Sequence, residues 1–292
     1  MYLEYENYMM PGSLEEALSM LKEYKGQARI IAGGTDLVID IGNKKRTPGC
    51  LVDITRIDEF KEIRQEGDYI DIGAGVSHNE VAKSQLINEK ATALAQGCAE
   101  VGSLQIRNVG TVVGNVVNAQ PAADAAVALV ALGASVKITD TEGTREELVE
   151  DVYAGVGTSK IDSSREIATG VKVPIAGANQ GSSFVRIAKR NALALPMLNA
   201  AAAVSLRGED IEWARIVMSP VGPAPTRVTE GEKVLSGASA VENKLKEAAE
   251  QASQQAQPRS SKLRGSAGYR RSVLKALIIR ALKQAVAQAK GE

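Results

Sequence analysis

The sequence predicts an α+β protein in which α/β units are followed by an antiparallel sheet with helices. Helix and strand patterns alternate from residue 13 to about residue 57, which is the signature of a small α/β unit. A Gly-rich polar segment at 175–182 then provides the best internal boundary. After that boundary come three alternating segments and two helical ones, the pattern of a meander closed by helices.

The first unit begins with a clear helix signal. Ser13 can cap a helix and Glu16 stands three residues later as its capping-box partner. We expect buried strands at 28–31 and 51–54, with a short helix over 35–41 between them.

The remaining elements follow from the same patterns. Helices are expected at 81–86, 91–101, 122–132, 241–255 and 267–289. Strands are expected at 69–73, 135–139, 166–173, 183–188, 200–206 and 212–218.

Composition excludes several classes of function. Lys plus Arg and Asp plus Glu both number 35, which argues against a broad basic face for nucleic acid. The apolar runs are too short to cross a membrane, and the N-terminus lacks the features of a signal peptide. We therefore expect a cytoplasmic protein with no membrane span.

The scarce metal-binding side chains narrow the chemistry. Cys50 and Cys98 are the only cysteines and His78 is the only histidine, too few for an iron–sulfur cluster or a zinc site. We expect both cysteines to be buried and His78 to lie near a helix start on the surface. No catalytic or metal-binding residue is predicted, so the chemistry must come from a bound cofactor or a partner.

A first glycine-bearing loop lies between a predicted strand and a predicted helix. It runs from Ile30 to Leu37, with Gly33-Gly34 followed by Thr35-Asp36. Glycines allow a close backbone approach to a ligand, and exposed amides before a helix can hold a phosphate. Alone, such a turn is more often a plain tight connection.

A second loop is predicted around Gly110 to Asp124. It brings Thr111, Gly114, Asn115 and Asp124 together ahead of an apolar helix, and such groups can bind sugar hydroxyls and ring nitrogens. The simpler interpretation is a turn with Asp124 early in a helix. Together, however, two such loops could hold opposite ends of one dinucleotide. The segment Gly155–Lys160 lacks P-loop spacing and is not expected to bind a nucleotide, and no Rossmann glycine motif is present.

These segments resemble the FAD-binding medium subunits of the xanthine dehydrogenase and carbon monoxide dehydrogenase family of molybdenum hydroxylases. The resemblance is carried by AGGTDL at 32–37, QIRN at 105–108, T-x-x-G-N at 111–115 and PAAD at 121–124, in the family's order. LVDI at 51–54 and the terminal YRRSVLKALIIRAL also match. The resemblance covers essentially the whole chain.

The resemblance implies a PCMH-type FAD-binding domain over 1–175, made of two α/β subdomains at about 1–57 and 58–175. A C-terminal domain over 183–292, with a three-stranded antiparallel sheet and helices, would follow. The cofactor is expected between the subdomains. The residues implied to hold it are Ile30, Ile31, Ala32, Gly33, Gly34, Thr35, Asp36, Leu37, Val101, Thr111, Val112, Val113, Gly114, Asn115, Asp124 and Arg186.

One position departs from the family pattern. The first glycine of T-x-G-G-N is replaced by Val113. Because valine does not easily adopt positive φ, we expect the backbone at Val113 to keep a negative φ or to shift its approach to the flavin.

The resemblance implies an oxidoreductase subunit with noncovalent FAD, since His78 lies outside both loops. Electrons would come from [2Fe–2S] clusters on a small partner subunit, the molybdenum cofactor would belong to a large one, and NAD⁺ is the expected acceptor. Two alternatives remain at this point. One is a self-sufficient flavin reductase of the same broad fold, although such reductases carry a G-x-G-S-N loop. The other is a scaffold subunit that has lost its cofactor.

Overall fold

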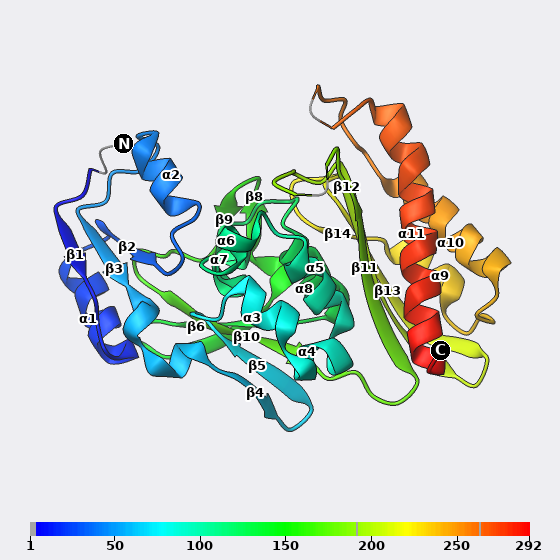
Figure 1. Cartoon of the computed structure of the whole chain (residues 1–292), viewed down its shortest axis with the longest axis horizontal. Coiled ribbons are helices and arrows are strands. Elements are labelled where there is room, and N and C mark those ends of the chain that lie inside the picture. Colours follow the sequence, from blue (N-terminus) through cyan, green and yellow to red (C-terminus); the bar gives the residue numbers. More distant parts are fainter. Residues whose placement is uncertain (1–3, 191, 263) are drawn as a thin grey trace.

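Three larger sheets and one small one organise the chain in the computed structural model, which describes residues 4–190, 192–262 and 264–292. The sheets follow one another along the sequence, and the first lies at the opposite end of the molecule from the C-terminal helices (Figure 1). This order agrees with the predicted α+β class.

The first sheet is parallel, with strand order β1-β3-β2. Its elements are β1 (Asn7–Met9), α1 (Leu14–Glu23), β2 (Ala28–Ile31), α2 (Leu37–Gly42) and β3 (Cys50–Asp53). Ser13 caps α1 as expected, by accepting from the Glu16 amide at 3.2 Å. The capping box is incomplete, because the Glu16 carboxylate accepts from the Gly12 amide instead of the Ser13 amide. Strand β1 was not predicted, since it is short and mostly exposed.

The second sheet has the order β4-β5-β10-β6-β7, and each neighbouring pair is antiparallel. Its strands are β4 (Ile63–Glu66), β5 (Tyr69–Gly73), β6 (Ser135–Thr139), β7 (Thr144–Leu148) and β10 (Ile167–Pro174). The 3₁₀ turns Ile54–Arg56 and Asp58–Lys61 join it to the first sheet, and a third 3₁₀ turn, Val149–Val152, follows β7. The strands at 69–73 and 135–139 have the predicted bounds.

Helices fill the long connection between β5 and β6. They are α3 (His78–Lys83), α4 (Gln85–Lys90), α5 (Thr92–Ala99), α6 (Leu104–Arg107), α7 (Val112–Val117) and α8 (Asp124–Leu132). The single helix predicted at 81–86 is wrong. Ser84 has an extended backbone conformation that ends α3, and its side chain caps α4 by accepting from the Ile87 amide. Helix α8 is buried along its whole length, which explains its uninterrupted apolar sequence.

The third sheet is antiparallel, with the order β11-β12-β13-β14. It consists of β11 (Gln180–Ile187), β12 (Leu198–Arg207), β13 (Asp210–Ser219) and β14 (Thr226–Arg227). The three long strands agree with the predicted meander, and β14 adds a short fourth strand. Strand β11 begins inside the segment 175–182, so the connection between the second and third sheets is shorter than expected.

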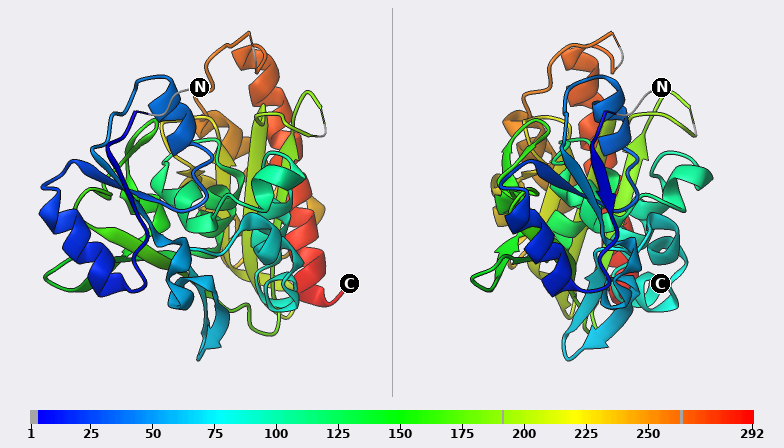
Figure 2. Two further views of the ribbon diagram at one scale, coloured as in Figure 1. Left: turned by 60° about the vertical axis from the view of Figure 1, so that its left-hand side comes forward. Right: turned by 90° about the vertical axis from the view of Figure 1, so that its left-hand side faces the viewer.

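Helices cover both faces of this sheet. Helices α5 and α8 pack against β11 and β12 on one face. The C-terminal helices α9 (Thr229–Leu235) and α11 (Ala267–Lys290) pack against the other, and two views of the ribbon show α11 lying along it (Figure 2). Helix α10 (Glu242–Gln255) packs on α9 and α11. Among the described residues, none of these helices is long and apolar enough to span a membrane.

Candidate functional site

The first glycine-bearing loop forms the turn between β2 and α2. Gly34 has a φ of +66°, a conformation that glycine adopts without steric cost. Within the described chain, no group accepts a hydrogen bond from the backbone amides of Gly33 to Asp36. Such a run of free amides is a ready set of donors for an anionic ligand.

The first loop is in direct contact with the second. A Cβ built on Gly33 would lie 2.0 Å from the Val109 carbonyl oxygen, so only glycine permits this approach. On the other side, a Cβ built on Gly110 would lie 3.4 Å from Thr35 Oγ1. The two loops therefore meet, although more than seventy residues separate them in the sequence.

The second segment is a helix rather than the predicted loop. Thr111 is the N-cap of α7, and its hydroxyl accepts from the Gly114 amide at 3.0 Å. Val113 lies inside this helix with a negative φ, as expected for a branched residue at this position. The Asn115 side chain accepts from the Ala126 amide at 3.3 Å and thereby ties α7 to α8.

Asp124, the first residue of α8, joins the second sheet's helices to the third sheet. Its carboxylate accepts from Arg186 Nη1 at 2.7 Å and from Asn199 Nδ2 at 2.9 Å. The Asp124 and Arg186 side chains are both only 7% exposed. Burial raises the pKa of Asp124 to about 6, and the charge of Arg186 opposes that rise. This is a buried ion pair at the joint between two parts of the fold.

Arg186 also fixes a loop of the third sheet. Its Nη2 donates to the Ala194 carbonyl at 2.9 Å, and the Leu193 amide donates to the Gly102 carbonyl at 3.1 Å. These bonds hold residues 193–196 against the helical layer.

A cavity of about 930 Å³ lies where these segments meet. It is lined by 29–37 from the first loop, by residues between 101 and 124, by 156–163 and by 193–196. Its volume is at the upper end of the range of about 300–1,000 Å³ found for ligand sites. All the residues predicted to bind the cofactor line this cavity except Val112 and Arg186. Val112 points into the core, and Arg186 is engaged with Asp124 behind the cavity wall.

Comparison with known proteins identifies this arrangement. Residues 3–176 match the FAD binding domain of molybdopterin dehydrogenases. The chain belongs to this family. Residues 183–285 match the CO dehydrogenase flavoprotein C-terminal domain.

Individual relatives agree with the family. The chain is 33% identical to the nicotinate dehydrogenase FAD-subunit of Eubacterium barkeri over 79% of both chains. It is 30% identical to the glyceraldehyde dehydrogenase medium chain of Sulfolobus acidocaldarius over 97% of this chain and 99% of the relative. A crystal structure of a Cu,Mo-CO dehydrogenase superposes with a TM-score of 0.91 at 28% identity, covering 99% of this chain and 100% of that one. The protein is therefore an FAD-binding medium subunit of a molybdenum hydroxylase complex. The members of this family are oxidoreductases.

The cavity of this FAD subunit suits a dinucleotide. The free amides of Gly33 to Asp36 are donors for phosphate oxygens, and these four residues line the cavity. Both polar and apolar residues line the cavity, as a molecule with both phosphates and an aromatic ring system requires.

Sequence reasoning missed one wall of the site. Residues 156–160, which lack P-loop spacing, line the cavity through the turn between β8 (Tyr153–Gly155) and β9 (Thr158–Ser159). Gly157 has a φ of +66° and its amide donates to the Ala119 carbonyl at 3.0 Å. The glycines of this segment were the only sequence signal that it could line a ligand site, but their spacing matches no phosphate-binding motif.

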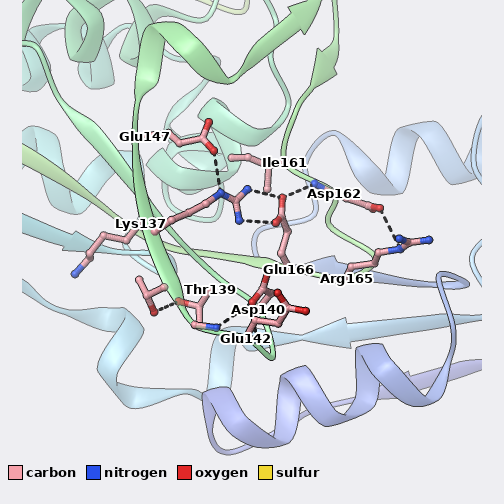
Figure 3. Close-up of polar contacts among 12 residues, drawn as sticks. Lys137, Thr139, Asp140, Glu142, Glu147, Ile161, Asp162, Arg165 and Glu166 are labelled. Atoms are coloured by element: carbon pink, nitrogen blue, oxygen red, sulfur yellow. Dashed lines mark hydrogen bonds and ion pairs between the residues drawn. The ribbon is translucent and has the colours of Figure 1, made fainter.

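An ion-pair network supports this missed wall (Figure 3). Arg145 on β7 binds both oxygens of Glu166, at 2.8 and 3.1 Å, and its Nε donates to Glu147 at 2.8 Å. Glu166 in turn accepts from the Asp162 amide at 2.9 Å. Because Asp162 and Glu166 line the cavity, the network fixes the end of the wall.

The expectation for His78 is wrong in part. His78 is the first residue of α3 as predicted, but it is only 2% exposed instead of lying on the surface. It also lines the cavity beside Gly110, so its distance from the loops in the sequence did not place it outside the site. Cys50 and Cys98 are free and buried, as predicted.

Proposed function

We propose that this FAD subunit takes electrons from [2Fe–2S] clusters of a small partner subunit and passes them to NAD⁺ or another acceptor. The observation that carries the proposal is the single cavity lined by both predicted loops, with free amides along one of them. When bound, FAD supplies the exchange of one or two electrons, and the protein supplies binding and orientation.

The residues divide this work along the cavity. We assign the amides of Gly33 to Asp36 to the pyrophosphate, because they are unpaired and lie at the loop between β2 and α2. The flavin and the ribityl or adenosine portions are assigned to the cavity-lining residues Val101, Thr111, Val113, Gly114, Asn115 and Asp124. Arg186 would act through Asp124 and the 193–196 loop, where its hydrogen bonds are.

The other redox centres belong to partner subunits. Among the described residues there is no group of His, Cys, Asp or Glu side chains able to hold a metal ion. The molybdenum cofactor and the [2Fe–2S] clusters are those of the large and small subunits of these complexes. We propose that the FAD is noncovalent and that the complex is cytoplasmic, in keeping with the two free cysteines.

The test uses the complex purified with its partner subunits. We expect flavin absorption from the medium subunit and release of the flavin on acid precipitation. Substrates should include a purine, a nicotinate-like heterocycle, an aldehyde and carbon monoxide, with NAD⁺ reduction followed for each. A subunit without flavin would indicate a scaffold. A flavin that reduces a substrate without the partners would indicate a self-sufficient reductase. Flavin reduced by the complex but never reoxidised by NAD⁺ would assign another acceptor.

A further inference from the structure

The only histidine of the chain lies at the junction of the two loops. His78 begins α3, and its backbone amide donates to the Gly110 carbonyl at 3.0 Å. A Cβ built on Gly110 would lie 3.6 Å from His78 Cδ2 and 3.4 Å from Thr35 Oγ1. The imidazole and the first loop therefore flank the same glycine, and both line the cavity.

One nitrogen of the imidazole is already engaged. His78 Nδ1 lies 3.5 Å from Cys98 Sγ. Burial lowers the pKa of His78 to about 4, with a smaller contribution from the charge of Arg107, so the ring is neutral at pH 7. Burial also raises the pKa of the Cys98 thiol, which therefore keeps its proton.

The contact between these two neutral groups bears on which ring nitrogen carries the hydrogen. Apart from His78 Nδ1, no acceptor for the Cys98 S–H is found in the described chain. If the thiol donates to Nδ1, the hydrogen of the neutral imidazole must be on Nε2. Nε2 has no hydrogen-bond partner among the described residues, and it is not one of the completely buried unpaired side-chain atoms, so it keeps some accessible surface. A donor without a protein partner, in a ring that lines a cavity, is available to a ligand in that cavity.

We propose that His78 binds the FAD pyrophosphate through Nε2–H, with Cys98 holding the ring in the donating tautomer. The inference rests on the proposed function, because it requires FAD in this cavity. A phosphate oxygen fits best, since the unpaired amides of Gly33 to Asp36 belong to the same junction and favour an anion. His78 is thus a binding residue, and Cys98 is a positioning residue that acts through it.

The first measurement exploits the single histidine. Full-length chain labelled with ¹⁵N-histidine and lacking a histidine tag gives one imidazole, so its resonances need no assignment. We expect a protonated Nε2 before ligand is added, and a shift of the Nε2–H signal when FAD is added. Riboflavin, which lacks both phosphates of FAD, should leave that signal in place. An Nδ1-protonated ring, or an Nε2–H signal that FAD does not move, overturns the proposal.

The second measurement is FAD affinity by titration of the stripped full chain. The change His78→Leu removes the donor, and the dissociation constant should rise about tenfold to a hundredfold, as for loss of a hydrogen bond to a charged group. The change His78→Gln restores an N–H donor and should recover most of the affinity. Unchanged affinity in His78→Leu, or equal losses in both variants, contradicts the assignment.

Cysteine variants test the positioning role. Cys98→Ala should weaken FAD binding several-fold and let the ¹⁵N spectrum show both tautomers. Cys50→Ala is the matched control, because Cys50 is equally buried but is not the cysteine in contact with His78 Nδ1. Identical results for the two variants would remove Cys98 from the proposal. If the wild-type chain takes up no FAD at all, the proposed function is wrong and this inference fails with it. If the chain takes up FAD but shows neither the Nε2–H shift nor the affinity losses of the variants, only the inference is wrong.

Discussion

Replacing Arg186 by methionine should destabilise the protein in a way that depends on pH. The variant leaves the Asp124 carboxylate buried with only Asn199 as a partner. Removing one member of a buried ion pair typically costs about 3–5 kcal/mol. Unfolding entropy of about 2.1 cal/mol/K per residue, taken over 292 residues, is roughly 0.6 kcal/mol/K, so Tm should fall by about 5–8 °C.

The pH dependence follows from the pKa of Asp124. Burial raises it from 3.8 to about 6, so the wild-type folded state gains stability from this group as pH falls from 6 toward 4. Without Arg186 the pKa rises further, and the folded variant holds a proton at pH values where the wild type does not. Its stability deficit should therefore grow by about 1.4 kcal/mol for each pH unit above 6, until the variant's own pKa is reached.

The assay is thermal unfolding at pH 6, 7 and 8 with saturating FAD. Arg207→Met is the matched control, since Arg207 pairs with Glu212 on an exposed strand end and its loss should produce little change at any pH. The reasoning would be refuted by a deficit in Arg186→Met that is the same at pH 6 and pH 8, or by one no larger than that of the control.

Three further predictions concern the cavity walls. Gly33→Ala places a Cβ 2.0 Å from the Val109 carbonyl oxygen, so flavin content should drop and the free energy of unfolding should fall by about 1–3 kcal/mol or more. The control Gly268→Ala, in open space on α11, should be neutral or slightly stabilising. Equal flavin content in the two variants would contradict this prediction. Thr111→Val should cost about 1 kcal/mol through loss of the α7 cap, measured by denaturant unfolding, and Thr111→Ser should retain the cap; equal stability of the two variants would rule out the cap. Arg145→Met frees Glu166 and should weaken FAD binding several-fold by titration without altering the first loop; unchanged affinity would show that the network does not support the wall.

Most of the fold could be predicted because its signals are local. The strand at 28–31, the glycine pair after it and the Ser13 cap each depend on neighbouring residues, and the structure has all three. The apolar run at 122–132 likewise predicts a buried helix without reference to the rest of the chain. The errors occur where short elements compete. Ser84 ends one helix and caps the next, and hydrophobic periodicity alone predicts one continuous helix across such a position.

The sequence by itself determined the family motifs and the two segments that we propose to hold the cofactor, and its two cysteines and one histidine led to the prediction of no metal centre. Tertiary structure alone decided which other segments reach the cavity. His78, the turn at 156–160 and the loop at 193–196 are separated in sequence from both glycine-bearing segments, and only packing brings them together. It also decided the surroundings of Arg186, whose charge looks available in the sequence but is paired with Asp124 in the fold. The physical reason is that burial and pairing are properties of long-range contacts, whereas propensity and spacing are properties of neighbours along the chain.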